Sequence, residues 1–495
     1  MTDRLTLEAL GQIRPVLVLI VTLGVILLGA LLGMRRSLLA VALAGLAAAL
    51  VSALRLSPES GGWLSNYLFL DPLYRFAILF LCGFLGAVLL VSGSLWRKPS
   101  WEWPVYLCML LGSLTGMILL ASARHLIFLA IAFEMASLPS YVLVGFRRFN
   151  TKSAEGAAKY VIFGAVCSAL MVYGISLLYG VTGTFDWEQV VLRLATNGLS
   201  SLAVIALICL FVGLAFKISL VPMHFWCPDA FEAAGADITA WLSVASKSAA
   251  LLALARLTHV LLPSVAPALQ NLMILALALV AIVTMTLANL SAYWQTSVKR
   301  LLAYSSIAHA GYITCGVLVF SDAGGMAAIV AYVLVYLLMN LGAFTVAGLI
   351  EQQTGTDHLD HFTGLGIRNP KLAAAMTIFL FSLVGLPPLA GFAAKWILLS
   401  VLWQHQLAFV AVAILANTLL SLFYYMRIAR AMYFGSVGEA SAHAEGSGSQ
   451  PLTAIEVPAF AAVVLATCTV GLLVLFVGWG VLNSFSLNLC SLVNQ

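Results

Sequence analysis

Charged residues are scarce in this chain: Asp, Glu, Lys and Arg make up 9% of its 495 residues, whereas a soluble domain carries about 25%. Hydrophobic residues make up 62%, and the mean hydropathy is +1.06. The length would accommodate several soluble domains, but this composition excludes them. Apolar runs of about 20 residues recur from one end of the chain to the other, which predicts many membrane-spanning helices.

The chain also lacks the sequence features of several other protein classes. Its eight cysteines show no CxxC spacing, and most lie within apolar runs, which argues against a disulfide framework, a metal site or an iron–sulfur site. The net charge of +5 is small and spread out, so nucleic acid is not an expected partner. The first apolar run follows Arg14, has no small-residue cleavage site and ends at Arg35-Arg36, which indicates a retained helix and not a signal peptide.

The apolar runs predict an all-α polytopic membrane protein with about 14 transmembrane helices joined by short loops. Residues 435–450, rich in Ser, Gly, Ala and Glu, predict a flexible loop before the last helix. The predicted segments are 15–34, 37–54, 74–95, 103–122, 125–146, 153–180, 199–231, 237–260, 266–291, 300–320, 324–350, 371–403, 406–434 and 455–482.

The basic residues of the predicted loops predict the orientation in the membrane. Thirteen follow odd-numbered helices: Arg35, Arg36, Arg97, Lys98, Arg147, Arg148, Lys152, Lys299, Arg300, Arg368, Lys371, Arg427 and Arg430. Five follow even-numbered helices: Arg55, Arg75, Arg124, Arg193 and Arg256. By the positive-inside rule, the odd loops are cytoplasmic and both termini lie on the periplasmic side of the inner membrane, although Arg4 and Arg14 run against this trend.

The remaining basic residues fall inside predicted helices. They are Lys159, Lys217, Lys247 and Lys395. Glu134 is the one acid in the middle of a predicted helix. Because each such group costs several kcal/mol at bilayer depth unless it is paired or hydrated, five of them indicate an internal polar path.

Segments 7 and 12 are each about 33 residues long, although about 20 would suffice. Segment 7 contains Pro222 and segment 12 contains Pro387-Pro388, so both are predicted to be two half-helices. The breaks lie about 165 residues apart, which predicts a five-helix unit used twice, as helices 4–8 and 9–13, in inverted orientation. The predicted domains are an N-terminal three-helix segment (1–102), two repeats (103–260 and 261–434), and a polar loop with a C-terminal helix (435–495).

Buried lysines and a buried glutamate suit proton transfer. Separating the partners of a buried Glu–Lys pair makes the lysine release its proton more readily. Burial readily shifts the pKa of a lysine, whereas a buried arginine stays protonated. The candidate relay residues are therefore Glu134, Lys159, Lys217, Lys247 and Lys395, with His309 in the middle of segment 10 as a further candidate.

Several of these residues have an alternative interpretation. Lys159 is also consistent with snorkelling to the surface or with a surface pair with Glu155. Glu134 has the alternative of a structural counter-ion, and His309 that of a satisfied core histidine. His224, beside the first break, is either a further relay member or a residue that satisfies freed carbonyls. Four further residues are interpreted as structural: Asp229 and Glu232 as vestibule or capping residues, and Tyr424 and Tyr425 as packing residues.

The chain resembles the antiporter-like membrane subunits of respiratory complex I, and among them most closely the N-type subunit of bacterial NADH–quinone oxidoreductase. The motifs that carry this resemblance are FEMASLPSYVLVGF, GLAFKISLVPMHFWCPDAFE, LSVASKSAALLALAR, SVKRLLAYSSIAHAGYI and SLVGLPPLAGFAAKW. One motif differs, because PDAFE is followed by AAGAD where the family usually has a Gly-Ala-Pro turn. Asp237 is therefore an additional acid near the mouth of helix 8.

The resemblance implies 14 helices with inverted repeats and proton translocation coupled to remote electron transfer. Glu134 matches the acid of helix 5, and Lys217, Lys247 and Lys395 match the lysines of helices 7, 8 and 12. Lys159 and His309 occupy positions that the family often makes polar. A proton would reach Lys247 from the cytoplasm, pass through water and His309 to Lys395, and leave on the far side.

The resemblance also implies partners. No cofactor is expected in this chain, because no flavin, nicotinamide or iron–sulfur motif is present; NAD, flavin, iron–sulfur clusters and quinone are expected in partner subunits. The expected partners are other membrane-arm subunits, of the M type and the small K, J and A types, within the lipid bilayer. Two alternatives stay open: a subunit of a multisubunit sodium/proton antiporter, and a membrane scaffold without an ion path.

Overall fold

The computed structural model describes residues 11–34, 37–56, 63–95, 102–147, 150–319, 323–434 and 455–491. The predicted loop at residues 435–450 lies outside the described residues. Twelve helical segments of the described chain are long and apolar enough to cross a membrane, and two shorter apolar helices, Leu38–Leu54 and Pro370–Val384, occupy two further predicted positions. The all-helical membrane fold with about 14 spanning segments is confirmed.

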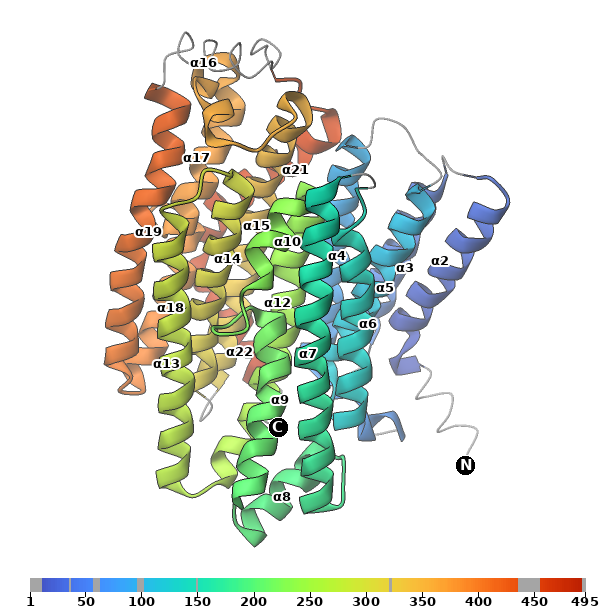
Figure 1. The fold of residues 1–495 in the computed structure, drawn as a ribbon, viewed down its shortest axis with the longest axis vertical. Coiled ribbons are helices and arrows are strands. Elements are labelled where there is room, and N and C mark those ends of the chain that lie inside the picture. The colour runs from blue at the N-terminus through green and yellow to red at the C-terminus, as the bar shows by residue number, and fades with distance from the viewer. Residues whose placement is uncertain are drawn as a thin grey trace.

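The first six spanning helices form the N-terminal part of the bundle (Figure 1). They are α2 (Arg14–Leu31), α3 (Leu38–Leu54), α4 (Pro72–Leu95), α5 (Trp103–Ser122), α6 (Leu126–Val144) and α7 (Thr151–Thr182). A single turn, η1 (Trp63–Asn66), precedes α4. One helix was not expected: α8 (Trp187–Asn197) is amphipathic, and Asp186 caps its N-terminus by accepting a hydrogen bond from the backbone N–H of Gln189.

Segments 7 and 12 are broken as predicted. Segment 7 consists of α9 (Ser201–Ile218) and α10 (Trp226–Ala233), and segment 12 of α17 (Pro370–Val384) and α18 (Ala390–Gln404). Each break contains a cis peptide bond, at Val221-Pro222 and Pro387-Pro388. Figure 1 shows α9–α10 rising through the bundle and α17–α18 descending, which is the antiparallel relation expected of inverted repeats.

Segment 8 changes its helical winding before Lys247. It runs as α11 (Ala236–Trp241), the π-helix η2 (Leu242–Ser246) and α12 (Lys247–Leu261), followed by the short turn η3 (Leu262–Ser264). Single π-turns inside helices are often found at functional sites, because they change the direction in which the following side chains point.

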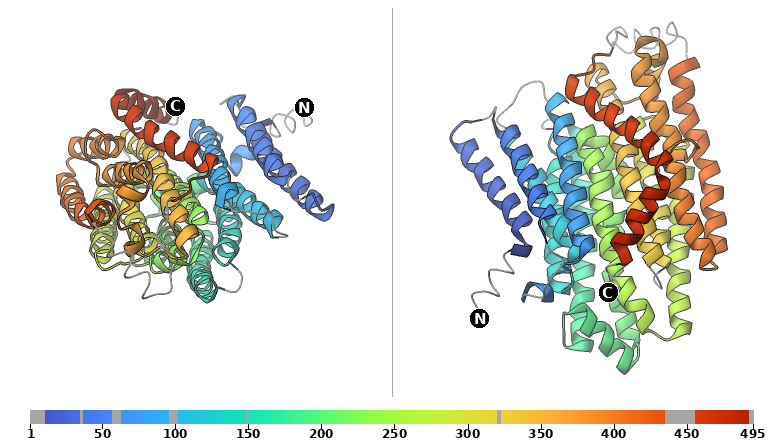
Figure 2. Two further views of the ribbon diagram at one scale, coloured as in Figure 1. Left: turned by 90° about the horizontal axis from the view of Figure 1, so that it is seen from above. Right: turned by 180° about the vertical axis from the view of Figure 1, so that it is seen from behind.

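The remaining helices complete the second half. They are α13 (Pro267–Ala292), α14 (Val298–Thr314) with η4 (Cys315–Leu318), α15 (Ala323–Thr354), η5 (Leu359–Phe362), α16 (Leu365–Arg368), α19 (Ala408–Phe434), α21 (Ala459–Val477) and α22 (Trp479–Ser491). The prediction of one final helix over 455–482 was wrong, because the chain divides at Gly478 and continues to Ser491. The two final helices lie at an angle to each other at the back of the bundle and pack against α15 (Figure 2).

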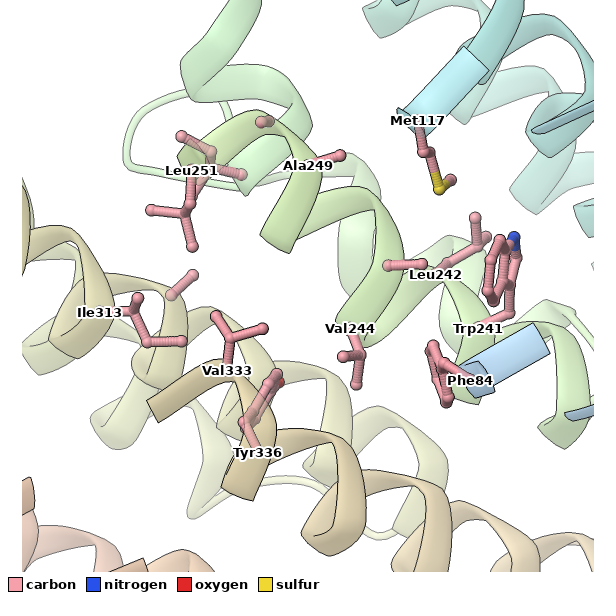
Figure 3. Close-up of a cluster of buried hydrophobic side chains, with 14 of the residues drawn as sticks. Phe84, Met117, Trp241, Leu242, Val244, Ala249, Leu251, Ile313, Val333 and Tyr336 are labelled. Atoms are coloured by element: carbon pink, nitrogen blue, oxygen red, sulfur yellow. The ribbon is translucent and has the colours of Figure 1, made fainter. Parts of the chain in front are cut away.

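Segments 8, 10 and 11 lie at the centre, and most of their side chains are buried, whereas about a third or fewer of those in α2, α13 and α21 are buried. Figure 3 shows apolar side chains of this core, including Phe84 of α4, Trp241 of α11, Val244 of η2 and Val333 of α15. The rings of Phe84 and Trp241 lie 5.3 Å apart. Lys217, Lys247 and Lys395 are 0%, 1% and 5% exposed, so their side chains lie within this packed interior.

Candidate functional site

Lys217 lies in the last turn of α9, before the first break. Its side chain is fully buried, and its Nζ donates a hydrogen bond to Ser137 Oγ of α6 at 2.9 Å. Glu134, one turn earlier on α6, is half-buried and accepts a hydrogen bond from Ser168 Oγ of α7. The amine and the carboxylate interact electrostatically, but the hydrogen-bond partner of the amine is a hydroxyl group.

Lys247 begins α12, directly after the π-helix, and is 1% exposed. Its Nζ donates to Ser306 Oγ of α14 at 2.5 Å and lies 5.8 Å from the centre of the Phe231 ring. His224 is buried beside the first break and interacts both with the backbone of Pro222 and electrostatically with Lys247. Both interpretations of His224 therefore stay open.

His309 lies between two of the predicted lysines. It is buried in α14, and its Nδ1 forms a hydrogen bond with the Tyr332 hydroxyl of α15 at 3.0 Å. The Tyr336 ring stacks on the imidazole at 5.1 Å. Electrostatic interactions link His309 with both Lys247 and Lys395. His309 is thus satisfied by a partner and is also placed where a relay member would be.

Lys395 connects the two halves of segment 12. It is 5% exposed, and its Nζ donates to the carbonyls of Leu383 at 3.2 Å and Val384 at 2.8 Å. These are the two carbonyls that lose their helical partners, because the residues four positions later, Pro387 and Pro388, have no N–H. The amine therefore satisfies the backbone groups that the double proline leaves free.

Two further contacts complete the surroundings of Lys395. Its Nζ lies 3.3 Å from Thr418 Oγ1 of α19 and 4.8 Å from the centre of the Tyr312 ring. The Tyr312 hydroxyl accepts a hydrogen bond from Asn289 at 3.0 Å, and Asn289 Oδ1 accepts one from Tyr424 at 3.0 Å. Sequence reasoning missed this polar group, since Asn and Tyr carry no charge that marks them in an apolar run.

Tyr424 and Tyr425 do pack on each other, with ring centres 4.4 Å apart. Both hydroxyls are also hydrogen-bonded, that of Tyr425 to Ser305. These tyrosines therefore belong to the buried polar region as well as to the apolar packing.

Lys159 has more partners than the sequence indicated. The predicted pair with Glu155 is present, at 2.7 Å, and Lys159 also pairs with Asp229 of α10 at 2.8 Å. Its side chain is 42% exposed, so it is not a deeply buried group like the other three lysines. Further ion pairs extend this outer charged cluster, whose members are Lys152, Glu155, Lys159, Asp229, Glu232 and Arg300.

Asp237 does not face an open mouth. It is 5% exposed, and its Oδ2 accepts a hydrogen bond from the Tyr106 hydroxyl at 2.7 Å. Nearby, Glu351 at the end of α15 pairs with Arg147 at 2.5 Å and with Lys299 at 2.9 Å. Burial lowers the pKa of Arg147, but its interactions with Glu351 outweigh burial and raise that pKa overall.

Two basic residues that the sequence analysis assigned to loops are buried within helices. Lys299 lies in the first turn of α14 and is 1% exposed. Arg256 lies within α12 with a buried side chain and forms two hydrogen bonds to Asp71, at 2.5 and 2.7 Å. Each has an acidic partner from a distant segment, and this ion pair is why the interior tolerates the charge. Because the partners are far apart in the sequence, sequence position alone did not reveal the burial.

The three deep lysines share one chemical environment. Their amines donate to hydroxyl groups or carbonyls, and no carboxylate in the described part of the chain forms an ion pair with them. Such an amine can alternate between charged and neutral forms without breaking an ion pair. The described residues contain no cluster of His, Cys, Asp or Glu that could hold a metal ion.

Comparison with known proteins gives consistent matches. The family model described as NADH:quinone oxidoreductase/Mrp antiporter, TM, matches residues 123–421. The chain is 39% identical to the NADH-quinone oxidoreductase subunit N of Anaeromyxobacter sp. (strain Fw109-5), over 85% of this chain and 86% of that protein. It is 38% identical to the F(420)H(2) dehydrogenase subunit N of Methanosarcina mazei, over 75% and 76%.

Solved structures are similar over nearly the whole chain. A chain of respiratory complex I from Thermus thermophilus with bound aureothin is 29% identical, with a TM-score of 0.75 over 95% of this chain and 98% of that one. A chain of the Mrp complex from Dietzia sp. DQ12-45-1b is 22% identical, with a TM-score of 0.82 over 98% and 97%. At that identity, the second similarity concerns the fold alone.

Proposed function

This chain belongs to the subunit N family of the NADH:quinone oxidoreductase/Mrp antiporter membrane proteins, and we propose that it translocates protons through its buried lysines within a respiratory complex. The observation that carries this proposal is the placement of Lys217, Lys247 and Lys395. All three are buried in the interior of the bundle, and each is bonded to neutral polar groups. A scaffold would gain nothing from three amines that form no ion pair with the described residues, since each costs several kcal/mol at that depth.

Glu134 and Lys217 form the switch in this proposal. Ser137, which now accepts from the Lys217 amine, lies three residues after Glu134 on the same face of α6. A change of rotamer would bring the amine from the hydroxyl group to the carboxylate. In the first position the lysine releases its proton more readily, and in the second it retains it.

Lys247, His309 and Lys395 form the lateral path. His309 interacts with both lysines, so it can receive a proton from one side and pass it to the other. Lys159 belongs to the outer charged cluster, where its exposure suits exchange of protons with the surroundings. We assign it the role of collecting protons, and Lys395 the role of releasing them.

The division into two repeats, 103–260 and 261–434, is part of the same proposal. It is supported by the two broken segments at matching positions, which run in opposite directions (Figure 1). The N-terminal three-helix segment (1–102) and the C-terminal segment (435–495) would then lie outside the repeated unit. Both termini are proposed to be periplasmic, on the basis of the distribution of basic residues.

The redox chemistry is proposed to take place in other subunits. NAD, flavin, iron–sulfur clusters and quinone would be bound there, and the M-type and the small K-, J- and A-type subunits would contact this chain in the membrane. The alternative of a sodium/proton antiporter subunit is supported by the family model, whose description also includes Mrp antiporters, and by similarity of fold.

The test uses Lys217→Ala and Lys247→Ala in the assembled complex, with electron transfer and proton translocation measured in the same vesicles. Proton translocation per electron is expected to fall in both variants while assembly is retained. Lys371→Ala is the matched control, because Lys371 is exposed at the start of α17. Unchanged translocation in both test variants would contradict the proposal and favour the scaffold alternative.

A further inference from the structure

The ring of Tyr312 on α14 lies against the amine of Lys395. The Lys395 Nζ is 4.8 Å from the ring centre, and an ammonium group within about 6 Å of that point is attracted by the negative face of the ring. The other two deep lysines face phenylalanine rings, at 5.6 and 5.8 Å. Tyr312 is therefore the one ring of the three that carries a hydroxyl group by which its position can be fixed.

A buried amide holds that hydroxyl group. Asn289 of α13 is 0% exposed, and its Nδ2 donates a hydrogen bond to the Tyr312 hydroxyl at 3.0 Å. The same Nδ2 lies 3.1 Å from both the carbonyl oxygen and Oδ1 of Asn417 on α19. Turning the Asn289 amide over would bring oxygen against oxygen, so its N–H groups are directed at Tyr312 and Asn417.

Helix α19 fixes the amide from its other side as well. The Tyr424 hydroxyl donates to Asn289 Oδ1 at 3.0 Å, and Asn417 uses its own Nδ2 on Thr286 Oγ1 and the Ala413 carbonyl, both at 3.0 Å. Asn417 and Tyr424 are 4% and 2% exposed. Because a buried polar network with every partner in place is rigid, it determines where the Tyr312 ring lies.

The proposed first repeat has other residues at the matching positions. Two backbone hydrogen bonds of 2.9 Å recur in the two repeats, with each residue of the second bond 172 positions after its counterpart: Leu126 N–H to the Phe185 carbonyl, and Val298 N–H to the Asp357 carbonyl. By this register, Asn289 and Tyr312 correspond to Met117 and Ser140. The amide and the ring therefore accompany Lys395 and are not a general requirement of the repeated fold.

We propose that Asn289 is a positioning residue for Lys395, because by fixing the Tyr312 hydroxyl it keeps the ring over the amine and favours the protonated form of the lysine. This inference rests on the proposed function, in which Lys395 takes up a proton before it releases one. The ring attracts the ammonium group and contributes little to the neutral amine. Without the ring, Lys395 is loaded with a proton only at lower pH.

Few other charges act on this amine. His309 of α14 interacts electrostatically with Lys395, and its ring meets that of Tyr312 edge to face at 5.5 Å. The other helices packed against α18 are α15, α17, α19, α21 and α22. The charged residues of these five helices all lie within two turns of a helix end: Glu351, Lys371, Arg427 and Arg430.

Three substitutions separate the ring from its anchor. Asn289→Leu and Tyr312→Phe remove the same hydrogen bond from its two ends, whereas Tyr312→Leu removes the ring itself. The alkaline limb of the pH profile of proton translocation is expected to move to lower pH by about half a unit in the first two and about one unit in the third, which is about a threefold and a tenfold loss of proton affinity. The double variant Asn289→Leu/Tyr312→Phe should shift no further than either single variant.

The experiment measures assembly, electron transfer and proton translocation across a pH series in vesicles that contain the assembled complex. Thr314→Val is the control, because Thr314 is buried on the same helix as Tyr312 and its hydroxyl donates to the Ala310 carbonyl. Its pH profile is expected to match that of the unmodified protein. A purely structural amide predicts poorer assembly with no shift of the profile. If Asn289→Leu does not assemble, Tyr312→Phe tests the same hydrogen bond.

Lys395→Met, measured in parallel, separates this inference from the proposed function. Unshifted profiles in Asn289→Leu and Tyr312→Phe refute the role of Asn289, and an unshifted profile in Tyr312→Leu refutes the role of the ring. If Lys395→Met lowers proton translocation per electron in that case, the proposed function stands. If Lys395→Met also leaves translocation unchanged, both are refuted.

Discussion

Replacing Lys395 by methionine tests how the second break is held together. The substitution keeps an unbranched side chain but removes the donor to the carbonyls of Leu383 and Val384. The described residues offer these carbonyls no other donor, because Pro387 and Pro388 lack N–H groups. Leaving a buried carbonyl unsatisfied costs about 1–3 kcal/mol, so the expected loss of stability is about 2–6 kcal/mol.

Lys217→Met is the matched comparison. Among the described residues, the Lys217 amine donates a hydrogen bond to Ser137 Oγ alone, and that hydroxyl keeps its bond to the Phe133 carbonyl. Its loss is therefore expected to cost about 0.5–1.5 kcal/mol. Both variants are purified in mild detergent and unfolded with SDS, and the free energy of unfolding is followed by tryptophan fluorescence.

The two variants should differ by at least about 0.5 kcal/mol, with Lys395→Met the less stable. Equal stabilities would show that the amine of Lys395 does not hold the half-helices together. Lys395→Arg separates hydrogen bonding from proton release, because arginine donates hydrogen bonds but stays protonated. It should recover stability without recovering proton translocation.

Three other substitutions have definite expected outcomes. Gly391→Ala should reduce assembly, because a Cβ there would lie 1.8 Å from the Ser382 carbonyl oxygen, whereas Gly480→Ala meets nothing within 4 Å; blue-native gels report both. Glu351→Gln should lower the melting temperature markedly, since it leaves two cations without their acid, and exposed Glu155→Gln should change it little. Asp71→Asn should cost about 3–5 kcal/mol in SDS unfolding, because it leaves Arg256 buried without a counter-charge; a cost near zero would contradict this assignment.

Much of the fold could be predicted because membrane helices follow from local composition. Pro222 and Pro387-Pro388 marked both breaks, since proline acts on the backbone of its own helix. Helix α8 was missed because it is amphipathic and not continuously apolar. The division at Gly478 was missed because the apolar run continues on both sides of it.

The buried lysines could also be found from sequence, because an isolated charge in an apolar run is conspicuous. Their hydrogen-bond partners could not be predicted from the sequence. Nothing local indicates that Lys217 bonds to Ser137 or that Lys247 bonds to Ser306, residues 80 and 59 positions away. Lys299 and Arg256 were misplaced for the same reason, since their acidic partners, Glu351 of α15 and Asp71 just before α4, are distant in the sequence.

The contact between Lys395 and the end of α17 has a further electrostatic consequence. The aligned peptide dipoles of a helix leave about half a negative charge at its C-terminus, which stabilises a nearby cation. Lys395 therefore finds its counter-charge in the backbone and not in a side chain. When this lysine loses its proton, no carboxylate is left behind to attract it back, which favours its onward release over its return.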